Sequence, residues 1–151
     1  MKNQKGVTLM LLVATVAIMS IILGTISYSS ISALRMKLYY DMCADIELLD
    51  EKIALYYLKK KELPIQEEEI EIKSLIPSYD ENNENFNPNN SGVLSKINFG
   101  ELDNLSLNNS QDYYIDKKSH TIYFSRGIEM DGYTYYTIPL EYQEVDLQKY
   151  R

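Results

Sequence analysis

The feature that most constrains this chain is a long uncharged stretch near its N-terminus. Residues 7–34 contain no Asp, Glu, Lys or Arg. The apolar part of this stretch, residues 7–27, forms a helix of about 30 Å, which is the thickness of the hydrocarbon core of a bilayer. A secretory signal peptide has a shorter apolar stretch followed by small residues at a cleavage site, and neither property is found here. The sequence therefore predicts one membrane-spanning helix.

The helical pattern continues beyond this segment as an amphipathic stretch. Apolar residues recur every three or four positions and so fall on one helical face. They are Ile31, Leu34, Leu38, Met42, Ile46, Leu49, Ile53 and Tyr56. Three lysines at 59–61 favour a helix C-terminus, and Pro64 ends the helix. Because no proline interrupts residues 7–63 and Gly24 is the one weak point, we predict a continuous helix of about 55 residues.

Charge and composition exclude several classes of function. Residues 62–151 carry 7 basic and 17 acidic side chains, a net charge of −10. An acidic outer region repels phosphate backbones, which argues against general nucleic-acid binding. The chain has a single cysteine, Cys43, and a single histidine, His120. This excludes an intramolecular disulfide framework and a thiolate zinc cluster, and leaves no recognisable catalytic or cofactor site. We therefore expect no enzyme, no cofactor and no metal.

The remaining candidates for chemistry have simpler interpretations. Cys43 is expected to be a half-buried apolar side chain, with an intermolecular disulfide left open. His120 is expected at the start of a strand beside a turn. Alternate oxygen ligands in the Asn-rich segment 80–92 suggest a calcium site, but the full twelve-residue calcium loop is absent and a plain loop is favoured. The suggested ligands are Asp80, Asn82 and Glu84.

The C-terminal part of the chain has a β pattern. Residues 113–115, 121–124 and 133–138 are β-branched or aromatic, and Asp131-Gly132 is a strong turn signal. We predict a three-stranded antiparallel meander that covers the amphipathic helix face, with Ile122, Phe124, Tyr136 and Ile138 as candidates for its inner face. The expected fold class is α+β, with one long N-terminal helix, half transmembrane and half amphipathic, packed on a small antiparallel sheet.

The predicted organisation has five segments. Residues 1–6 form a short basic N-terminal segment, and residues 7–27 and 28–63 form the transmembrane and amphipathic halves of the helix. Residues 64–111 form an acidic and Asn-rich connection with a helical turn before Pro77, and residues 112–151 form the sheet region. The acidic run within the connection is expected to be a solvated face.

The N-terminus resembles that of the type IV pilin and pseudopilin family. A short basic leader ends at Gly6 and is followed by Val7-Thr8-Leu9-Met10 and the long apolar helix. The likeness is specific over residues 2 to about 27 and is consistent in architecture to about residue 64. It implies that a membrane prepilin peptidase cleaves after Gly6 and methylates Val7. It also implies an inner-membrane assembly platform and other pilin subunits as partners.

One position departs from the family pattern. Members of the family usually carry glutamate five residues after the cleavage site, where this chain has Leu11. That glutamate is thought to pair with the N-terminal amine of a neighbouring subunit, because a charge in an apolar filament core is costly unless paired. Leu11 therefore favours a minor pilin that initiates the filament or forms its tip. The alternative is that Leu11 is drift compensated by packing.

The function predicted from the sequence is structural. The resemblance implies a subunit of a pilus-like filament, held in the cytoplasmic membrane with its N-terminus inside and then transferred to a filament outside. The positive-inside rule supports this orientation through Lys2 and Lys5, whereas Arg35 and Lys37 oppose it. An alternative from another class is an uncleaved, single-pass, membrane-anchored binding module. A surface pilus, a type II secretion pseudopilus and a DNA-uptake filament all remain open.

Overall fold

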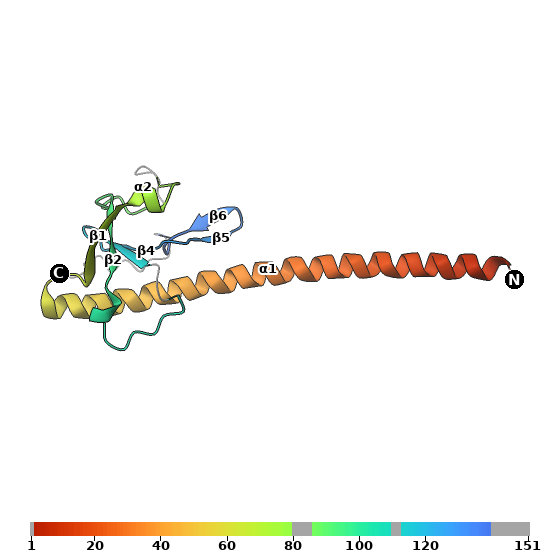
Figure 1. Ribbon diagram of the computed structural model, residues 1–151, viewed down its shortest axis with the longest axis horizontal. Coiled ribbons are helices and arrows are strands. Elements are labelled where there is room, and N and C mark those ends of the chain that lie inside the picture. The colour runs from red at the N-terminus through yellow and green to blue at the C-terminus, as the bar shows by residue number, and fades with distance from the viewer. Residues whose placement is uncertain (1, 80–85, 110–112, 140–151) are drawn as a thin grey trace. The chain divides into compact units, whose positions relative to one another are not determined.

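The computed structural model describes residues 2–79, 86–109 and 113–139. The chain divides into two compact units, Met1–Lys37 and Leu38–Arg151. Helix α1 runs from Lys2 to Lys60 and contributes to both units (Figure 1). The second unit adds a small antiparallel sheet, so the predicted α+β class with one long N-terminal helix is confirmed.

The long helix ends a few residues earlier than the sequence suggested. It stops at Lys60, and Lys61 adopts a left-handed conformation with φ of 60°. The Lys61 backbone N–H donates to the carbonyl of Tyr57 at 2.8 Å, which satisfies one of the carbonyls at the end of the helix. The left-handed residue stops the helix before Pro64, and Lys59 and Lys60 occupy its last turn as expected.

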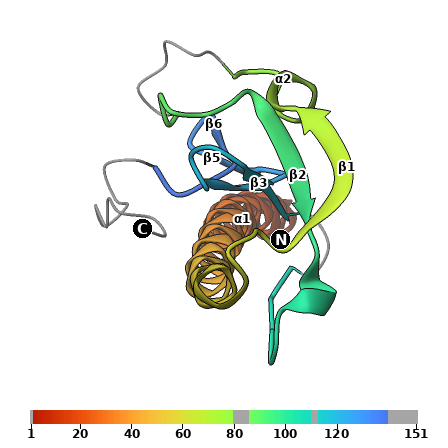
Figure 2. The same cartoon turned by 90° about the vertical axis from the view of Figure 1, so that its left-hand side faces the viewer.

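Two sheets make up the β structure of the second unit. The larger has four antiparallel strands in the order β1-β2-β3-β4, and the smaller is the β5-β6 hairpin. Figure 2 shows the strands gathered on one side of α1. The remaining elements are β1 (Ile65–Glu71), α2 (Ile72–Leu75), β2 (Val93–Ile97), η1 (Phe99–Glu101), β3 (Tyr113–Asp116), β4 (Ile122–Phe124), β5 (Ile128–Met130) and β6 (Tyr133–Tyr135).

Half of the four-stranded sheet comes from the region that we expected to be a connection. Strand β1 pairs with β2, and both lie within residues 64–111. The sequence pattern missed β1 because three consecutive glutamates, residues 67–69, give it a low β-propensity. The expected helical turn before Pro77 is present as α2. The sequence therefore predicted neither β1 nor β2.

The predicted meander is correct for two of its three strands. β3 and β4 pair in antiparallel fashion, with Tyr114 opposite Tyr123. The third predicted strand does not extend this sheet. Its first residues form β6, which pairs with β5 through a two-residue turn at Asp131 and Gly132, with φ values of 52° and 82°. Positive φ at both turn residues is the geometry expected for an Asp-Gly hairpin.

The main core lies between α1 and the four-stranded sheet. The helix supplies Met42, Ile46, Leu49 and Ile53, all buried, which confirms the central part of the predicted apolar face. Opposite them lie Ile97, Tyr113, Ile115, Ile122 and Phe124. Two of the four predicted inward residues, Ile122 and Phe124, are thus in this core. Ile138 packs half-buried against it, and Tyr136 packs instead against a second cluster around Ile72, Leu94 and Tyr123.

Candidate functional site

The first candidate site is the apolar part of α1. From Gln4 onward this helix is long and apolar enough to cross a membrane, and none of its most apolar window is buried in the structure. Val7, Met10 and Leu11 are 67%, 78% and 65% exposed. So large an exposed apolar surface is unusual for a soluble domain and indicates contact with lipid or with other apolar helices.

Several hydroxyl side chains within this segment are satisfied by the helix itself. Five of them donate to a backbone carbonyl three or four residues earlier in α1, at 2.8–2.9 Å. The donors are Thr8, Thr15, Ser20, Thr25 and Ser30. Because no water is available in a bilayer core, such internal bonds remove the cost of placing these groups in lipid. These five hydroxyl groups therefore add little to the cost of placing the segment in an apolar environment.

The predicted processing residues lie on the first turns of this helix. Gly6 and Val7 are both helical, and a Cβ added at Gly6 would meet no atom within 4 Å. Leu11 lies one turn beyond Val7 with its side chain exposed. The backbone at Gly6 is therefore ordinary helix, which glycine does not favour, and no packing within the described residues accounts for a glycine there.

A buried carboxylate organises the second unit, Leu38–Arg151, which we call the outer unit. Asp45, on α1, is 2% exposed, and its two oxygens accept hydrogen bonds from a segment more than 60 residues away. The backbone N–H groups of Asn108 and Asn109 donate at 2.8 and 2.9 Å, and the Tyr113 hydroxyl donates at 2.8 Å. The side-chain amides of both asparagines add longer bonds. Asp45 thus holds the start of β3 against the helix.

Sequence reasoning missed this residue. Asp45 is not among the residues of the predicted apolar face, yet it lies three residues after Met42 and four before Leu49, so it shares their face. The spacing of Asp45 from Met42 and Leu49 could have indicated its burial, and a charge on a buried helix face needs specific hydrogen-bond partners. The identity of those partners was not readable from the sequence because they lie far along the chain.

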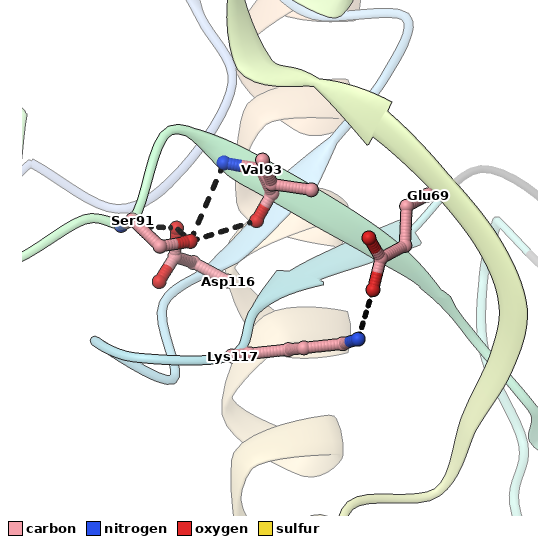
Figure 3. A network of polar contacts seen from close by, with 5 residues as sticks. All are labelled: Glu69, Ser91, Val93, Asp116 and Lys117. Atoms are coloured by element: carbon pink, nitrogen blue, oxygen red, sulfur yellow. Dashed lines mark hydrogen bonds and ion pairs between the residues drawn. The ribbon is translucent and has the colours of Figure 1, made fainter.

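A second carboxylate joins the Asn-rich segment to the sheet. Asp116, fully buried at the end of β3, accepts from the Ser91 backbone N–H and hydroxyl, both at 2.8 Å. Its other oxygen accepts from the backbone of Lys118 and Ser119, which shapes the β3–β4 turn. Figure 3 shows the contacts of Ser91 with Asp116 and Val93, together with the ion pair between Lys117 and Glu69 of β1. The four bonds to Asp116 all come from the chain itself, so they serve the fold.

A groove of about 1120 Å³ lies between α1 and the β5-β6 hairpin in the outer unit. It is rich in aromatic rings, and Tyr39 and Tyr135 meet edge to face across it with their centroids 5.2 Å apart. The described lining consists of Tyr39, Tyr40, Cys43, Glu47, Ser78, Phe86, Met130 and residues 132–139. Glu47 is the only Asp, Glu, Lys, Arg or His among them.

The other candidates for chemistry do not assemble into a site. His120 sits in the β3–β4 turn with φ of 57°, and its ring lies 5.7 Å from that of Tyr57. Cys43 is a half-buried free thiol whose pKa is raised by burial and by Glu47, against a lowering hydrogen bond from Tyr39. The suggested calcium ligands Asp80, Asn82 and Glu84 lie outside the described residues. Across residues 2–79, 86–109 and 113–139, no three His, Cys, Asp or Glu side chains are placed to hold a metal ion.

Comparison with known proteins identifies no relative of this chain. The chain matches no protein-family model, no curated protein and no solved structure. Its function must therefore be argued from the apolar helix, the carboxylate contacts and the groove.

Proposed function

We propose that this chain is a structural subunit of a type IV pilus-like filament, processed after Gly6 and methylated at Val7. Within such a filament it acts as a minor pilin or pseudopilin that initiates assembly or occupies the tip. The observation that carries the proposal is α1 itself. One helix of 59 residues supplies an exposed apolar segment and then the inner face of the outer unit's core, with no break between them.

That arrangement suits a filament subunit better than a simple anchor. An anchored domain needs only a spanning segment and a flexible linker, whereas here the spanning helix continues into the core through Met42, Leu49 and Ile53. The same helix therefore serves both the apolar segment and the core, as a filament subunit requires.

The assembly step proposed is an exchange of surroundings for residues 7–34. In the membrane their side chains contact lipid, and in the filament they contact helices of other subunits. Lipid tails are as apolar as leucine, so the exchange is nearly neutral in hydrophobic free energy. Specificity must then come from packing and from placed polar contacts. An assembly platform in the membrane would drive the transfer.

The proposed position at the start of the filament rests on Leu11. Without a carboxylate at this site the subunit has no partner for the N-terminal amine of a preceding subunit. Its own amine at Val7 still attracts the glutamate of the next one. A subunit that accepts a successor but has no predecessor is the first in the filament. Compensation of Leu11 by packing remains the competing explanation.

The second candidate is an uncleaved membrane-anchored binding module. The tyrosine-lined groove favours it, because an aromatic groove with one acidic residue is a plausible peptide or ligand site. The two candidates differ in the mature N-terminus. They also differ in whether the chain enters a polymer.

The test is the intact mass and N-terminal sequence of the membrane-associated protein from cells with and without prepilin peptidase. The filament proposal requires a chain that begins at Val7 with one added methyl group, seen only with the peptidase. A chain that begins at Met1 in both strains would refute it and leave the anchored module.

Gly6→Ala gives a matched test of processing. Alanine at this exposed helical position meets no neighbouring atom and favours the helix by up to ~1 kcal/mol, so the fold is preserved. Loss of cleavage in this variant would therefore report recognition by the peptidase. Gly24→Ala is the control, since it is equally open but lies far from the proposed cleavage site. Equal cleavage of the Gly6→Ala variant and the wild type would count against glycine-dependent processing.

A further inference from the structure

Strand β1 forms one of the two edges of the four-stranded sheet, whose order is β1-β2-β3-β4. Among the described residues it has a strand partner on one side only, and Figure 2 shows it at the margin of the sheet. An edge strand presents backbone N–H and C=O groups with which a strand of another chain can pair. Such an edge favours association between chains unless something blocks it.

A hydrogen bond at the end of β1 identifies which backbone groups point outward. The Ile72 N–H donates to the Gly92 carbonyl at 2.9 Å, which makes these residues a hydrogen-bonded pair. Hydrogen-bonded and non-hydrogen-bonded pairs alternate along antiparallel strands. In the register of β1 with β2, Ile70 is then hydrogen-bonded to β2 and Glu69 is not. The N–H and C=O of Glu69 therefore point away from β2, toward the open side.

The side chains along this edge are mostly acidic. Four of the seven residues of β1 are glutamates, Glu67, Glu68, Glu69 and Glu71, and all four are exposed. Glutamate has a low preference for strands, so these residues do not help β1 to form. Among them, Glu69 forms an ion pair with Lys117 in the β3–β4 turn. The charge on this strand therefore needs an explanation other than the stability of the sheet.

The strand also carries an irregularity in its pairing. Ile65 lies opposite Ile97 and Glu69 lies opposite Ser95, so four residue steps of β1 match two steps of β2. A bulge of this kind bends the strand and shortens the part of its edge that is regular. Charged side chains and bulges are the two means by which natural sheets commonly prevent pairing between edges. β1 has both.

Pairing of β1 with the β1 of a second copy would bring like charges together. In a twofold antiparallel pair that uses the outward groups of Glu69, this residue lies opposite its own copy. The same register places Glu67 opposite Glu71 on each side of the twofold axis. Like charges directly opposite each other in a sheet are destabilising. The glutamates thus oppose an association that the open backbone groups favour.

We infer that the glutamates of β1 keep an open sheet edge from pairing with a second copy of this chain, and that removal of their charge turns this edge into a contact between copies. The inference goes beyond the filament function, because it holds for a filament subunit and for an anchored module alike. In a filament, where copies are crowded together, it restricts their contacts to other surfaces.

The test compares the self-association of the full chain and a neutralised variant in nonionic detergent. The variant combines Glu67→Gln, Glu68→Gln and Glu71→Gln, and it keeps the ion pair between Glu69 and Lys117. Sedimentation velocity measures the dissociation constant of the dimer. Because the like charges that face each other across the twofold axis are removed, this constant should fall at least about tenfold.

The control variant removes the same number of charges elsewhere on the outer unit. It combines Glu47→Gln, Glu51→Gln and Asp103→Asn, all at exposed positions outside β1. Its dissociation constant should equal that of the wild type. Hydrogen exchange resolved to single amides then locates the contact. The Glu69 N–H should exchange rapidly in the wild-type monomer and become protected in the dimer of the neutralised variant.

A second measurement needs no substitution, so it does not depend on the folding of a variant. About 1 M sodium chloride shortens the range of electrostatic interactions to about 3 Å and so screens the glutamates of the wild-type chain. The wild type should then dimerise, with the Glu69 N–H protected. In low salt it should remain monomeric.

Four results would overturn the inference. Protection of the Glu69 N–H in the wild-type monomer would show that the edge is already covered. A neutralised variant that is no more associated than the wild type would show that the charges are not what blocks pairing. Equal association of the neutralised and control variants would make the effect one of net charge. Association without protection of this amide would place the contact on another surface. None of these outcomes depends on the N-terminal mass that tests the filament function.

Discussion

Removal of the Asp45 carboxylate should strongly destabilise the outer unit. In Asp45→Ala the hydroxyl of the fully buried Tyr113 loses the acceptor that lies 2.8 Å away. The loss of an acceptor by a buried donor costs about 1–3 kcal/mol. The N–H groups of Asn108 and Asn109 lie in partly exposed residues, where water can replace the carboxylate, so each lost bond costs about 1 kcal/mol. The expected loss in the free energy of unfolding is therefore ~3–5 kcal/mol.

A double-mutant cycle with Tyr113→Phe isolates the buried part of this cost. Phenylalanine removes the hydroxyl that Asp45→Ala would strand, so the two changes together should cost less than the sum of each alone. The expected coupling energy is ~1–3 kcal/mol. Urea unfolding of the full chain in nonionic detergent, followed by tyrosine near-ultraviolet circular dichroism, supplies the four free energies.

Two results would refute the reasoning about Asp45. A loss below ~1 kcal/mol would mean that the carboxylate is not an essential acceptor. Strict additivity with Tyr113→Phe would mean that the 2.8 Å contact contributes nothing to stability. Glu51→Ala, at an exposed position of the same helix, is the control and should change the free energy by less than ~0.5 kcal/mol.

Three further predictions follow from single residues. Ser95 is fully buried in β2, and its hydroxyl has no hydrogen-bond partner among the described atoms. Ser95→Ala should therefore raise the free energy of unfolding by ~1–2 kcal/mol, measured by urea unfolding. A lower free energy of unfolding in this variant would show that the hydroxyl has a partner. Burial raises the pKa of Tyr123 in the folded state. As pH rises past ~10, this tyrosine therefore ionises in the unfolded state before it does so in the folded state. The free energy of unfolding should then fall by up to ~1.4 kcal/mol per pH unit. Tyr123→Phe should reduce that fall, measured as urea midpoints at pH 10 and 11; an unchanged slope would contradict it. Leu11→Glu should let the subunit enter the filament shaft, and unchanged filament number and subunit position by immunogold microscopy would remove the tip assignment.

Part of the fold was predictable because its cause is local. The length of α1, its apolar first half and the burial of Met42, Leu49 and Ile53 follow from periodicity along a single segment. The pairing of β3 with β4 follows from two nearby β-prone runs joined by a short turn. Neither prediction needed knowledge of distant residues.

The candidate site was predictable only in part. The sequence alone indicated the exposed apolar helix and gave the residues Gly6, Val7 and Leu11 through the family resemblance. It did not indicate the tyrosine-lined groove, because α1 supplies one wall and the hairpin near residue 133 supplies the other. Tyrosines distributed over both faces of a strand do not reveal which of them share a concave surface.

The sequence by itself determined that this chain has one long helix, an apolar segment able to span a membrane and a mixed α+β architecture. Only the tertiary structure decided that β1 forms despite its glutamates, that β6 leaves the main sheet for a hairpin with β5, and that Asp45 is buried. The physical reason is the range of the interactions. A helix is specified by neighbours a few residues apart, whereas strand partners and the donors to a buried carboxylate are chosen among residues up to 68 positions away.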